Sequence, residues 1–211
     1  VHVHLGLYGS FAIRPGTGHP VVGQVRWRLE TSAGPSGHTA DLRGPTACEL
    51  LTAPEVDELI ARIGPDPLRP DADPDRAWAR IHASSAPIAT LLMDQKVLGG
   101  VGNVYRAEVL FRHGVAPMTA GRRIRRVRWQ AMWDDLVELM SQGVESGRID
   151  TVRPEHEPAA MGRDARVDDH GGEVYVYRRD GRDCFVCGTT VRTREVAGRN
   201  LFWCPTCQRG R

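Results

Sequence analysis

Lysine is nearly absent from this chain of 211 residues: Arg accounts for 27 of the 28 basic side chains, and Lys96 is the single lysine. The formal net charge is only +2, so total charge does not by itself argue for a nucleic-acid partner. No apolar run approaches the roughly 18 residues of a membrane-spanning helix, and no charged leader followed by an apolar run opens the sequence. We therefore expect a soluble, cytoplasmic protein.

Cysteines are few, but four of the five form two Cys-x-x-Cys pairs. Cys184 and Cys187 are separated from Cys204 and Cys207 by sixteen residues, which is the spacing of a structural zinc ribbon. Two disulfides are the alternative, but the pattern suits a metal in a reducing compartment better. Because four thiolates leave no open coordination position, we expect one structural Zn²⁺ that takes no part in chemistry.

The sixteen residues between these pairs predict a β-hairpin with its turn at Ala197-Gly198. The turn places Arg199 at the hairpin tip. An arginine presented there is suited to a phosphate or to a nucleic-acid groove. A plain surface arginine is an equally weighted alternative.

A glycine-rich turn at residues 94–103 joins two apolar helical runs. Its three glycines permit positive φ and let another backbone approach closely. The N–H groups of such a turn, and of the helix that follows, form a ready site for phosphate. Lys96 lies in this turn, and Asn103 stands where a helix cap or a phosphate contact is expected. A simple joint between two core helices is the alternative.

The N-terminal part of the chain is predicted to form a sheet. Residues 1–13 and 21–30 alternate apolar and polar side chains and predict two antiparallel strands joined by a loop, with a third strand at 38–42. Three strands bury little surface, so this part needs more sheet. Because Val1 already stands in strand-like alternation, we expect the chain to be a fragment that begins inside a sheet.

Helical periodicity dominates the middle of the chain. The predicted helices cover residues 54–63, 75–83, 87–94, 103–113 and 126–145. A polar stretch at 149–172 is expected to be irregular, and alternation at 174–177 predicts a strand. The Pro-rich segment 64–70 marks a domain boundary. The expected parts are 1–53, a linker at 54–72, a helical domain at 73–150, a loop at 151–173 and the zinc module at 174–211.

These motifs together resemble the formamidopyrimidine-DNA glycosylase and endonuclease VIII family of base-excision repair enzymes. Residues 93–111 resemble its helix-two-turns-helix signature, and 63–68 resemble its interdomain segment. The family's zinc finger is resembled by residues 176–181, the four cysteines, Gly198-Arg199 and residues 204–208. Its N-terminal domain is resembled by residues 4–9 and 41–44. The resemblance implies an α+β multidomain fold: the C-terminal part of an antiparallel β-sandwich, a helix-two-turns-helix domain and a zinc-ribbon hairpin.

The resemblance also implies base flipping in damaged double-stranded DNA. Leu7 and Tyr8 would fill the gap left by the extruded base, because an apolar wedge offsets the cost of unstacking. Lys96, Asn103 and Arg199 would hold phosphates beside the flipped nucleotide. The Leu-Tyr pair is similar to that of the endonuclease VIII branch, which favours oxidised pyrimidines. The resemblance further implies a monomer that acts in the nucleoid.

The family's catalytic residues have no counterpart in this sequence. They are the amine of an N-terminal proline, a neighbouring glutamate acid/base and a strand lysine, which together form a Schiff base and cut the strand by elimination. We expect these residues upstream of Val1, in a DNA glycosylase with abasic-site lyase activity. A non-catalytic, zinc-dependent damaged-DNA-binding protein is the alternative. An RNA-binding or ribosome-associated protein would not account for the ribbon and the wedge together.

Overall fold

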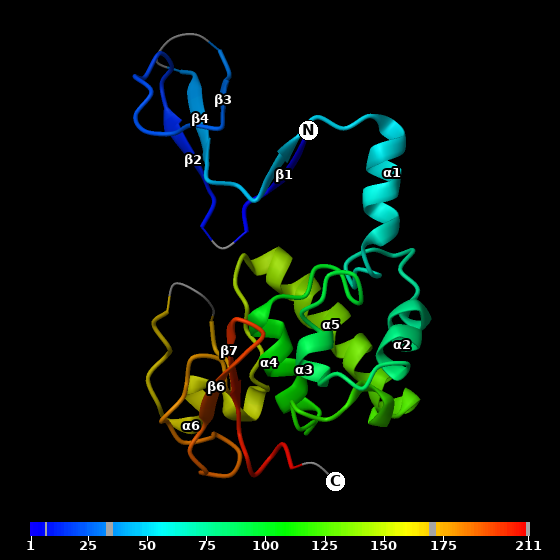
Figure 1. Cartoon of the computed structure of the whole chain (residues 1–211). Coiled ribbons are helices and arrows are strands. Elements are labelled where there is room, and N and C mark those ends of the chain that lie inside the picture. Colours follow the sequence, from blue (N-terminus) through cyan, green and yellow to red (C-terminus); the bar gives the residue numbers. More distant parts are fainter. Residues whose placement is uncertain (7, 33–35, 169–171, 210–211) are drawn as a thin grey trace. The chain divides into compact units, whose positions relative to one another are not determined.

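A computed structural model describes residues 1–6, 8–32, 36–168 and 172–209, and divides the chain into two compact units, Val1–Ile60 and Ala61–Arg211 (Figure 1). The division falls inside helix α1 (Ala53–Arg62), which matches the helix expected at 54–63. The finer five-part division stays a prediction. The strands of the first unit are β1 (His2–His4), β2 (Ser10–Pro15), β3 (Trp27–Glu30), β4 (His38–Arg43) and β5 (Ala47–Glu49).

The first unit holds two small antiparallel sheets, β1-β5 and β2-β4-β3. The expected pairing of residues 1–13 with 21–30 is therefore wrong, because β4 lies between β2 and β3 and pairs with both. The run at 1–13 is also interrupted after β1, where Gly6 adopts a φ of +67°. Such a conformation ends regular strand pairing at little cost only for glycine.

A buried carboxylate on the central strand accounts for this order. The side chain of Asp41 is fully buried and accepts hydrogen bonds from Arg14 of β2 and Arg28 of β3, each at 2.6 Å, and from Arg43 at 2.9 Å. The bond from Arg28, followed by that from Arg43, holds the pKa of Asp41 well below its usual range despite burial. Two neighbouring strands thus contribute the cations that a buried charge requires.

The second unit is mainly helical and carries a C-terminal hairpin (Figure 1). Its predicted helices are confirmed to within one residue at each end, except that the one expected at 87–94 is confined to four residues before the glycine-rich turn. The elements are α2 (Pro74–His82), α3 (Ile88–Leu91), α4 (Asn103–Arg112), η1 (Gly121–Arg123), α5 (Arg126–Ser146), η2 (Pro154–His156), α6 (Pro158–Met161), β6 (Arg192–Val196) and β7 (Arg199–Trp203). The loop expected at 151–173 is therefore not wholly irregular, since it contains η2 and α6.

Helix α5 supplies the largest apolar face of the second unit. The predicted core side chains Trp129, Met132, Trp133, Leu136, Leu139 and Met140 are buried, and they pack in one cluster with residues of α2, α3 and α4. The indole Nε1 of Trp129 donates to the carbonyl of Pro74 at 3.1 Å, so its one polar atom is satisfied. Gly147, with a φ of +68°, ends the helix in the left-handed conformation.

A second buried carboxylate, Glu108 of α4, organises the segment before the cysteines. Its two oxygens accept the backbone N–H groups of Tyr175, Val176 and Tyr177 at 2.7 to 2.8 Å and the hydroxyl of Thr151 at 2.6 Å. Three successive N–H groups can converge on one carboxylate only in a turn, because those of a strand alternate in direction. The strand expected at 174–177 is therefore wrong, and these residues form a turn around Glu108.

No helix in the described ranges combines the length and the apolar character that crossing a lipid bilayer requires.

Replacing Glu108 by Gln should destabilise the second unit by about 1.5 to 3 kcal/mol. The amide NH₂ of Gln would face backbone N–H groups that are themselves donors, and the charge-assisted hydrogen bonds of the carboxylate would be lost. Denaturant unfolding of Glu108→Gln, compared with wild type, measures the effect. Glu145→Gln, which changes an exposed glutamate near the end of α5, is the matched control and should differ from wild type by less than about 0.5 kcal/mol. Equal stabilities of the two variants would contradict this role of Glu108.

Candidate nucleic-acid interface and metal centre

The glycine-rich turn between α3 and α4 is held by the side chain of Gln95. Its Nε2 donates to the carbonyl of Val101, and its Oε1 accepts the N–H of Gly100, both at 3.0 Å. Gly100 has a φ of +76°, a conformation that favours glycine. The amide of Gln95 thus fixes the turn from inside and leaves the outward N–H groups of the helix start uncovered.

The segment 64–66 packs against this turn, backbone to backbone. Gly64 donates to the carbonyl of Gln95 at 2.8 Å, and Gly99 donates to the carbonyl of Pro65 at 3.0 Å. A Cβ built on Gly64 would lie 2.4 Å from the carbonyl carbon of Val97, which no side chain tolerates. The expected close approach of a second backbone is therefore confirmed, and it comes from the Pro-rich segment placed at the domain boundary.

Lys96 lies exposed within the turn. Its backbone N–H is bonded to Asp94 Oδ1 at 2.9 Å. Its amine has no ion-pair partner among the described residues, so this cation is available to an external anion.

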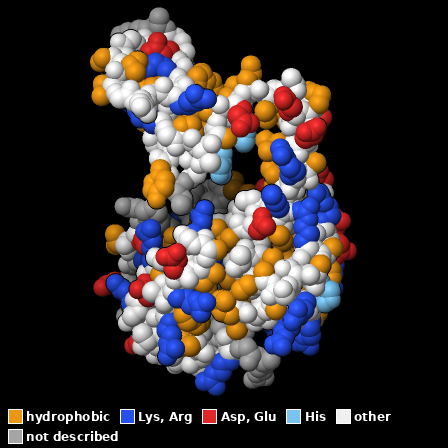
Figure 2. Space-filling model, in the orientation of Figure 1, with side chains coloured by type: hydrophobic (Ala, Val, Ile, Leu, Met, Phe, Trp, Pro, Cys, Tyr) orange, Lys and Arg blue, Asp and Glu red, His pale blue; other side chains and the backbone are white. Residues whose placement is uncertain are grey.

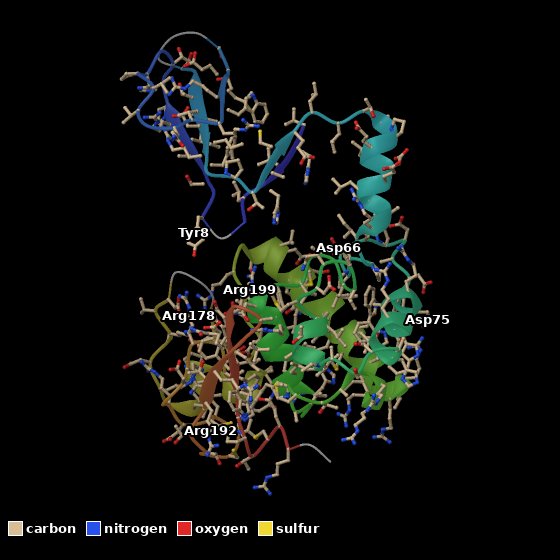
Figure 3. All side chains as sticks on the ribbon, in the orientation of Figure 1. Tyr8, Asp66, Asp75, Arg178, Arg192 and Arg199 are labelled. Carbon is tan, nitrogen blue, oxygen red and sulfur yellow. The ribbon has the colours of Figure 1, made fainter. Side chains whose placement is uncertain are left out.

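The hairpin tip has the conformation that its sequence predicts. Val196 of β6 pairs with Arg199 of β7, and the turn residues Ala197 and Gly198 have φ values of +52° and +72°. Positive φ at both central positions is the signature of a type I′ turn, whose twist matches that of the strands. Arg199 is consequently exposed at the tip (Figure 3).

The hairpin tip and the start of α4 meet at the carbonyl of Asn200. Asn103 Nδ2 and Arg106 Nη2 each donate to this oxygen at 3.0 Å, and Arg106 Nη2 also donates to Asn103 Oδ1. Two of the predicted phosphate ligands, Asn103 and Arg199, are thus brought to one place. The Asn103 amide keeps one N–H free for a ligand, because only one of its two is used by Asn200.

The spacing of the sequence motifs did not predict that Arg106 belongs to this site. Its side chain is 0% exposed, yet no carboxylate of the described chain pairs with it, and its Nε has no hydrogen-bond partner there. Burial, and then the neighbouring charge of Arg199, lower its pKa to about 10, so it stays a cation at neutral pH. A buried charge without a counter-ion is costly and marks this place as one suited to an anion. The signal in the sequence is an arginine on an otherwise apolar helix face.

The first turn of α4 adds hydrogen-bond donors to the same place. Its N-cap is Gly102, which offers no side chain, so the suggested capping role of Asn103 is wrong and Asn103 is the first helical residue. The N–H groups of Asn103, Val104 and Tyr105 have no acceptor among the described residues. Free N–H groups and the helix dipole favour an anion at this end. On the face seen in Figure 2, basic side chains are spread over much of the second unit.

Tyr8, one of the two predicted wedge residues, lies in the turn between β1 and β2. Tyr8 is 92% exposed, and the turn is closed by the N–H of Gly9 bonded to the carbonyl of Leu5 at 3.0 Å (Figure 3). An aromatic ring so exposed has no role in the core of its own unit. Leu7 lies outside the described residues.

The four predicted metal ligands form one cluster. Their Sγ atoms all lie within 4.8 Å of one another, with 3.9 Å between Cys184 and Cys207 and 3.5 Å between Cys187 and Cys204. Sulfurs bound at about 2.3 Å around a tetrahedral zinc are about 3.8 Å apart, so the donor set fits Zn²⁺. All four cysteines are free thiols, which excludes the disulfide alternative. The cluster is a structural zinc site.

Comparison with known proteins agrees with these features. Residues 63–153 match the formamidopyrimidine-DNA glycosylase H2TH domain, and residues 184–210 match the zinc finger found in FPG and IleRS. The chain is 51% identical to "Endonuclease 8 1" of Mycobacterium tuberculosis, over 99% of this chain and 76% of that protein. It is 32% identical to the formamidopyrimidine-DNA glycosylase of Stenotrophomonas maltophilia, over 98% of this chain and 74% of that protein.

Solved structures show the same fold. The structure of MutM in complex with DNA containing carbocyclic 8-oxo-G has a TM-score of 0.73 at 21% identity, covering 98% of this chain and 73% of the other. The Lactococcus lactis Fpg in complex with abasic-site DNA has a TM-score of 0.71 at 21% identity, covering 98% and 74%.

Removing the metal should unfold the hairpin module, because a ribbon of this size depends on its ion for folding. We expect one zinc per chain, released by a chelator or by Cys204→Ser together with a fall in melting temperature. Zinc release measured with a colorimetric chelator, alongside thermal unfolding, tests this. Cys48→Ser, the control outside the cluster, should keep both zinc and melting temperature. Unchanged melting after complete zinc loss would contradict a structural role.

Proposed function

Because this chain belongs to the formamidopyrimidine-DNA glycosylase and endonuclease VIII family, we propose that it removes oxidised bases from double-stranded DNA and cleaves the resulting abasic site by β-elimination. Members of the family are DNA glycosylases with abasic-site lyase activity. The observation that carries the proposal is the junction at the Asn200 carbonyl, where Asn103, Arg106 and Arg199 meet at the start of α4. This junction offers donors and positive charge, and no carboxylate of the described residues pairs with it.

In this proposal the junction grips the DNA backbone. Asn103 and the first-turn N–H groups of α4 hold one phosphate, and Arg199 holds a neighbouring one from the hairpin tip. Lys96 contributes a third contact from the exposed side of the turn. Phosphate contacts of this kind fix register and orientation without reading sequence, which suits an enzyme that must act at any position where damage occurs.

The proposal assigns Leu7 and Tyr8 to the space vacated by the flipped nucleotide. The exposure of Tyr8 supports this role, since an aromatic ring that covers no core of its own can stack on unpaired bases. The Leu-Tyr pair and the 51% identity to a protein named Endonuclease 8 favour oxidised pyrimidines as substrates. We further propose that the protein acts as a monomer in the nucleoid.

The nucleophile in this proposal is an amine. By family resemblance it belongs to an N-terminal proline beside a glutamate, for which residues 1–211 offer no counterpart, and the proposal places it upstream of Val1. The amine attacks C1′ of the sugar, the base leaves, and the resulting Schiff base undergoes elimination.

Replacing the phosphate ligands should weaken binding to abasic-site DNA. We expect Asn103→Ala and Arg199→Ala each to cost about 1 to 3 kcal/mol of binding free energy, because each removes a hydrogen bond to a charged group. Arg199→Ala should also reduce the slope of log K against log salt by about 1. Fluorescence anisotropy over a salt series measures both effects. Arg192→Ala, at the far end of the same hairpin (Figure 3), is the control and should bind almost as wild type does.

A borohydride trapping experiment tests the chemistry. Two proteins are each incubated with abasic-site DNA and borohydride. One is the chain of residues 1–211, and the other is the same chain with its native upstream sequence. We expect a covalent complex only when the upstream amine is present. Binding without trapping in both forms would refute the lyase and leave a non-catalytic damaged-DNA-binding protein.

A further inference from the structure

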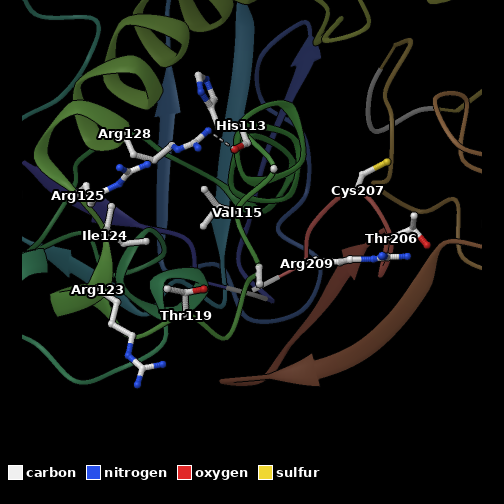
Figure 4. Close-up of a pocket in the computed structure, with 12 residues that line it drawn as sticks. His113, Val115, Thr119, Arg123, Ile124, Arg125, Arg128, Thr206, Cys207 and Arg209 are labelled. Carbon is white, nitrogen blue, oxygen red and sulfur yellow. Dashed lines mark hydrogen bonds between the residues drawn. The ribbon is translucent and has the colours of Figure 1, made fainter. Parts of the chain in front are cut away.

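A basic pocket of about 590 Å³ lies at the end of α4 opposite to Asn103 (Figure 4). It is formed by the loop after α4, by η1, by the start of α5 and by the second cysteine knuckle. Its lining includes the nearly buried apolar side chains Val115 and Ile124. Four exposed arginines surround this apolar lining: Arg123, Arg125, Arg128 and Arg209.

The positive charge of the pocket is not balanced within the described chain. None of the four guanidinium groups forms an ion pair there, and Arg128 donates to the carbonyl of His113 at 2.6 Å. Helix α5 has no acidic residue in its first turn, so its N-terminal dipole adds to the positive potential. Cys207, one of the four cysteines of the metal site, lies on the same side of the pocket as Arg209. Arg123 and Arg125 come from the opposite wall (Figure 4).

An apolar pocket adjoins the basic one. It has a volume of about 450 Å³ and shares Ala116 and Arg209 with its neighbour. Met118, Trp203 and Pro205 line it, and Met118 is 45% exposed. An exposed methionine beside an aromatic ring is an adaptable surface for a bulky apolar side chain.

We propose that the basic and apolar pockets together form a docking site for an extended segment of a partner protein, in which several carboxylates lie next to a large apolar side chain. The carboxylates pair with Arg123 and Arg125, whose forked donors suit them. The apolar side chain enters between Met118 and Trp203. Two adjacent pockets of different chemistry select for a segment that carries both kinds of side chain.

The position of the site favours a protein segment over nucleic acid. The ten residues of α4 span about 15 Å, and the pockets lie at the end of this helix and of β7 remote from Asn103 and Arg199. DNA held at the hairpin tip therefore leaves them accessible. No Phe, Tyr or Trp on which a base could stack is among the described residues that line the basic pocket, and its one aromatic ring, the imidazole of His113, is already bonded to Asp135. The site goes beyond base removal and would connect the protein to a partner.

The test uses a fluorescein-labelled peptide of four aspartates followed by Leu-Pro-Phe, with polarisation measured against the zinc-loaded protein at 150 mM salt. We expect saturable binding that the Arg123→Glu/Arg125→Glu pair weakens at least about tenfold and that Met118→Ser weakens about threefold. The milder Arg123→Ala/Arg125→Ala pair should weaken it in the same direction. Zinc content and affinity for abasic-site DNA should stay unchanged in these variants, which separates the docking site from the DNA site.

Matched controls decide the outcome. Arg76→Glu/Arg80→Glu changes the net charge equally on the exposed face of α2 and should leave peptide affinity within about twofold, because salt screens distant charges. Peptides with Asn for Asp, or with Ser for Leu and Phe, should bind far more weakly. Equal weakening by the α2 pair, or equal binding of the peptide without apolar residues, would overturn the proposal. So would displacement of the peptide by an oligothymidine whose binding needs Arg123 and Arg125.

Discussion

The arrangement of the second unit depends on one buried carboxylate. Glu108 projects from α4 and uses all its lone pairs on three successive backbone N–H groups and one hydroxyl. Losing any of these hydrogen bonds would leave a buried charge incompletely bonded, which is costly, so the turn at 174–177 has little freedom to move. That turn leads directly into the first cysteine knuckle. The orientation of the zinc module on the helical domain therefore follows from α4.

The same helix carries the opposite kind of buried charge two residues earlier. Arg106 is buried next to Arg199, and within the part of the chain that the structure describes its hydrogen bonds go only to neutral oxygens. Its uncompensated charge reduces stability, and an anion bound at the junction would offset that cost. The hydrogen bonds of Glu108 are complete within the chain, so its role is structural. Arg106 has no counter-ion among the described residues, and its charge suits a bound anion. Helix α4 thus carries a structural residue, Glu108, and a candidate anion-binding residue, Arg106, within one turn.

Local sequence patterns predict the elements whose contacts are local and miss those that depend on distant buried groups. Helix α5 was predictable because its apolar periodicity spans 21 residues, and the hairpin because Ala197-Gly198 and the cysteine spacing fix both turn and ends. The turn at 174–177 was not predictable, because the alternation of Val and Tyr is the same whether the N–H groups pair with a strand or with Glu108. Strand order around Asp41 likewise depends on a buried ion pair between residues far apart in sequence.

The sequence alone therefore determined the helices, the four zinc ligands, the glycine-rich turn and the family, since each rests on local spacing or on a contiguous motif. Only the tertiary structure decided that Asn103 and Arg199, 96 positions apart, meet at the carbonyl of Asn200, and that Arg106 is buried beside them. It also placed the arginines at the start of α5 around the basic pocket. Contacts between distant segments depend on which buried polar groups find partners, and a single sequence does not encode that choice locally.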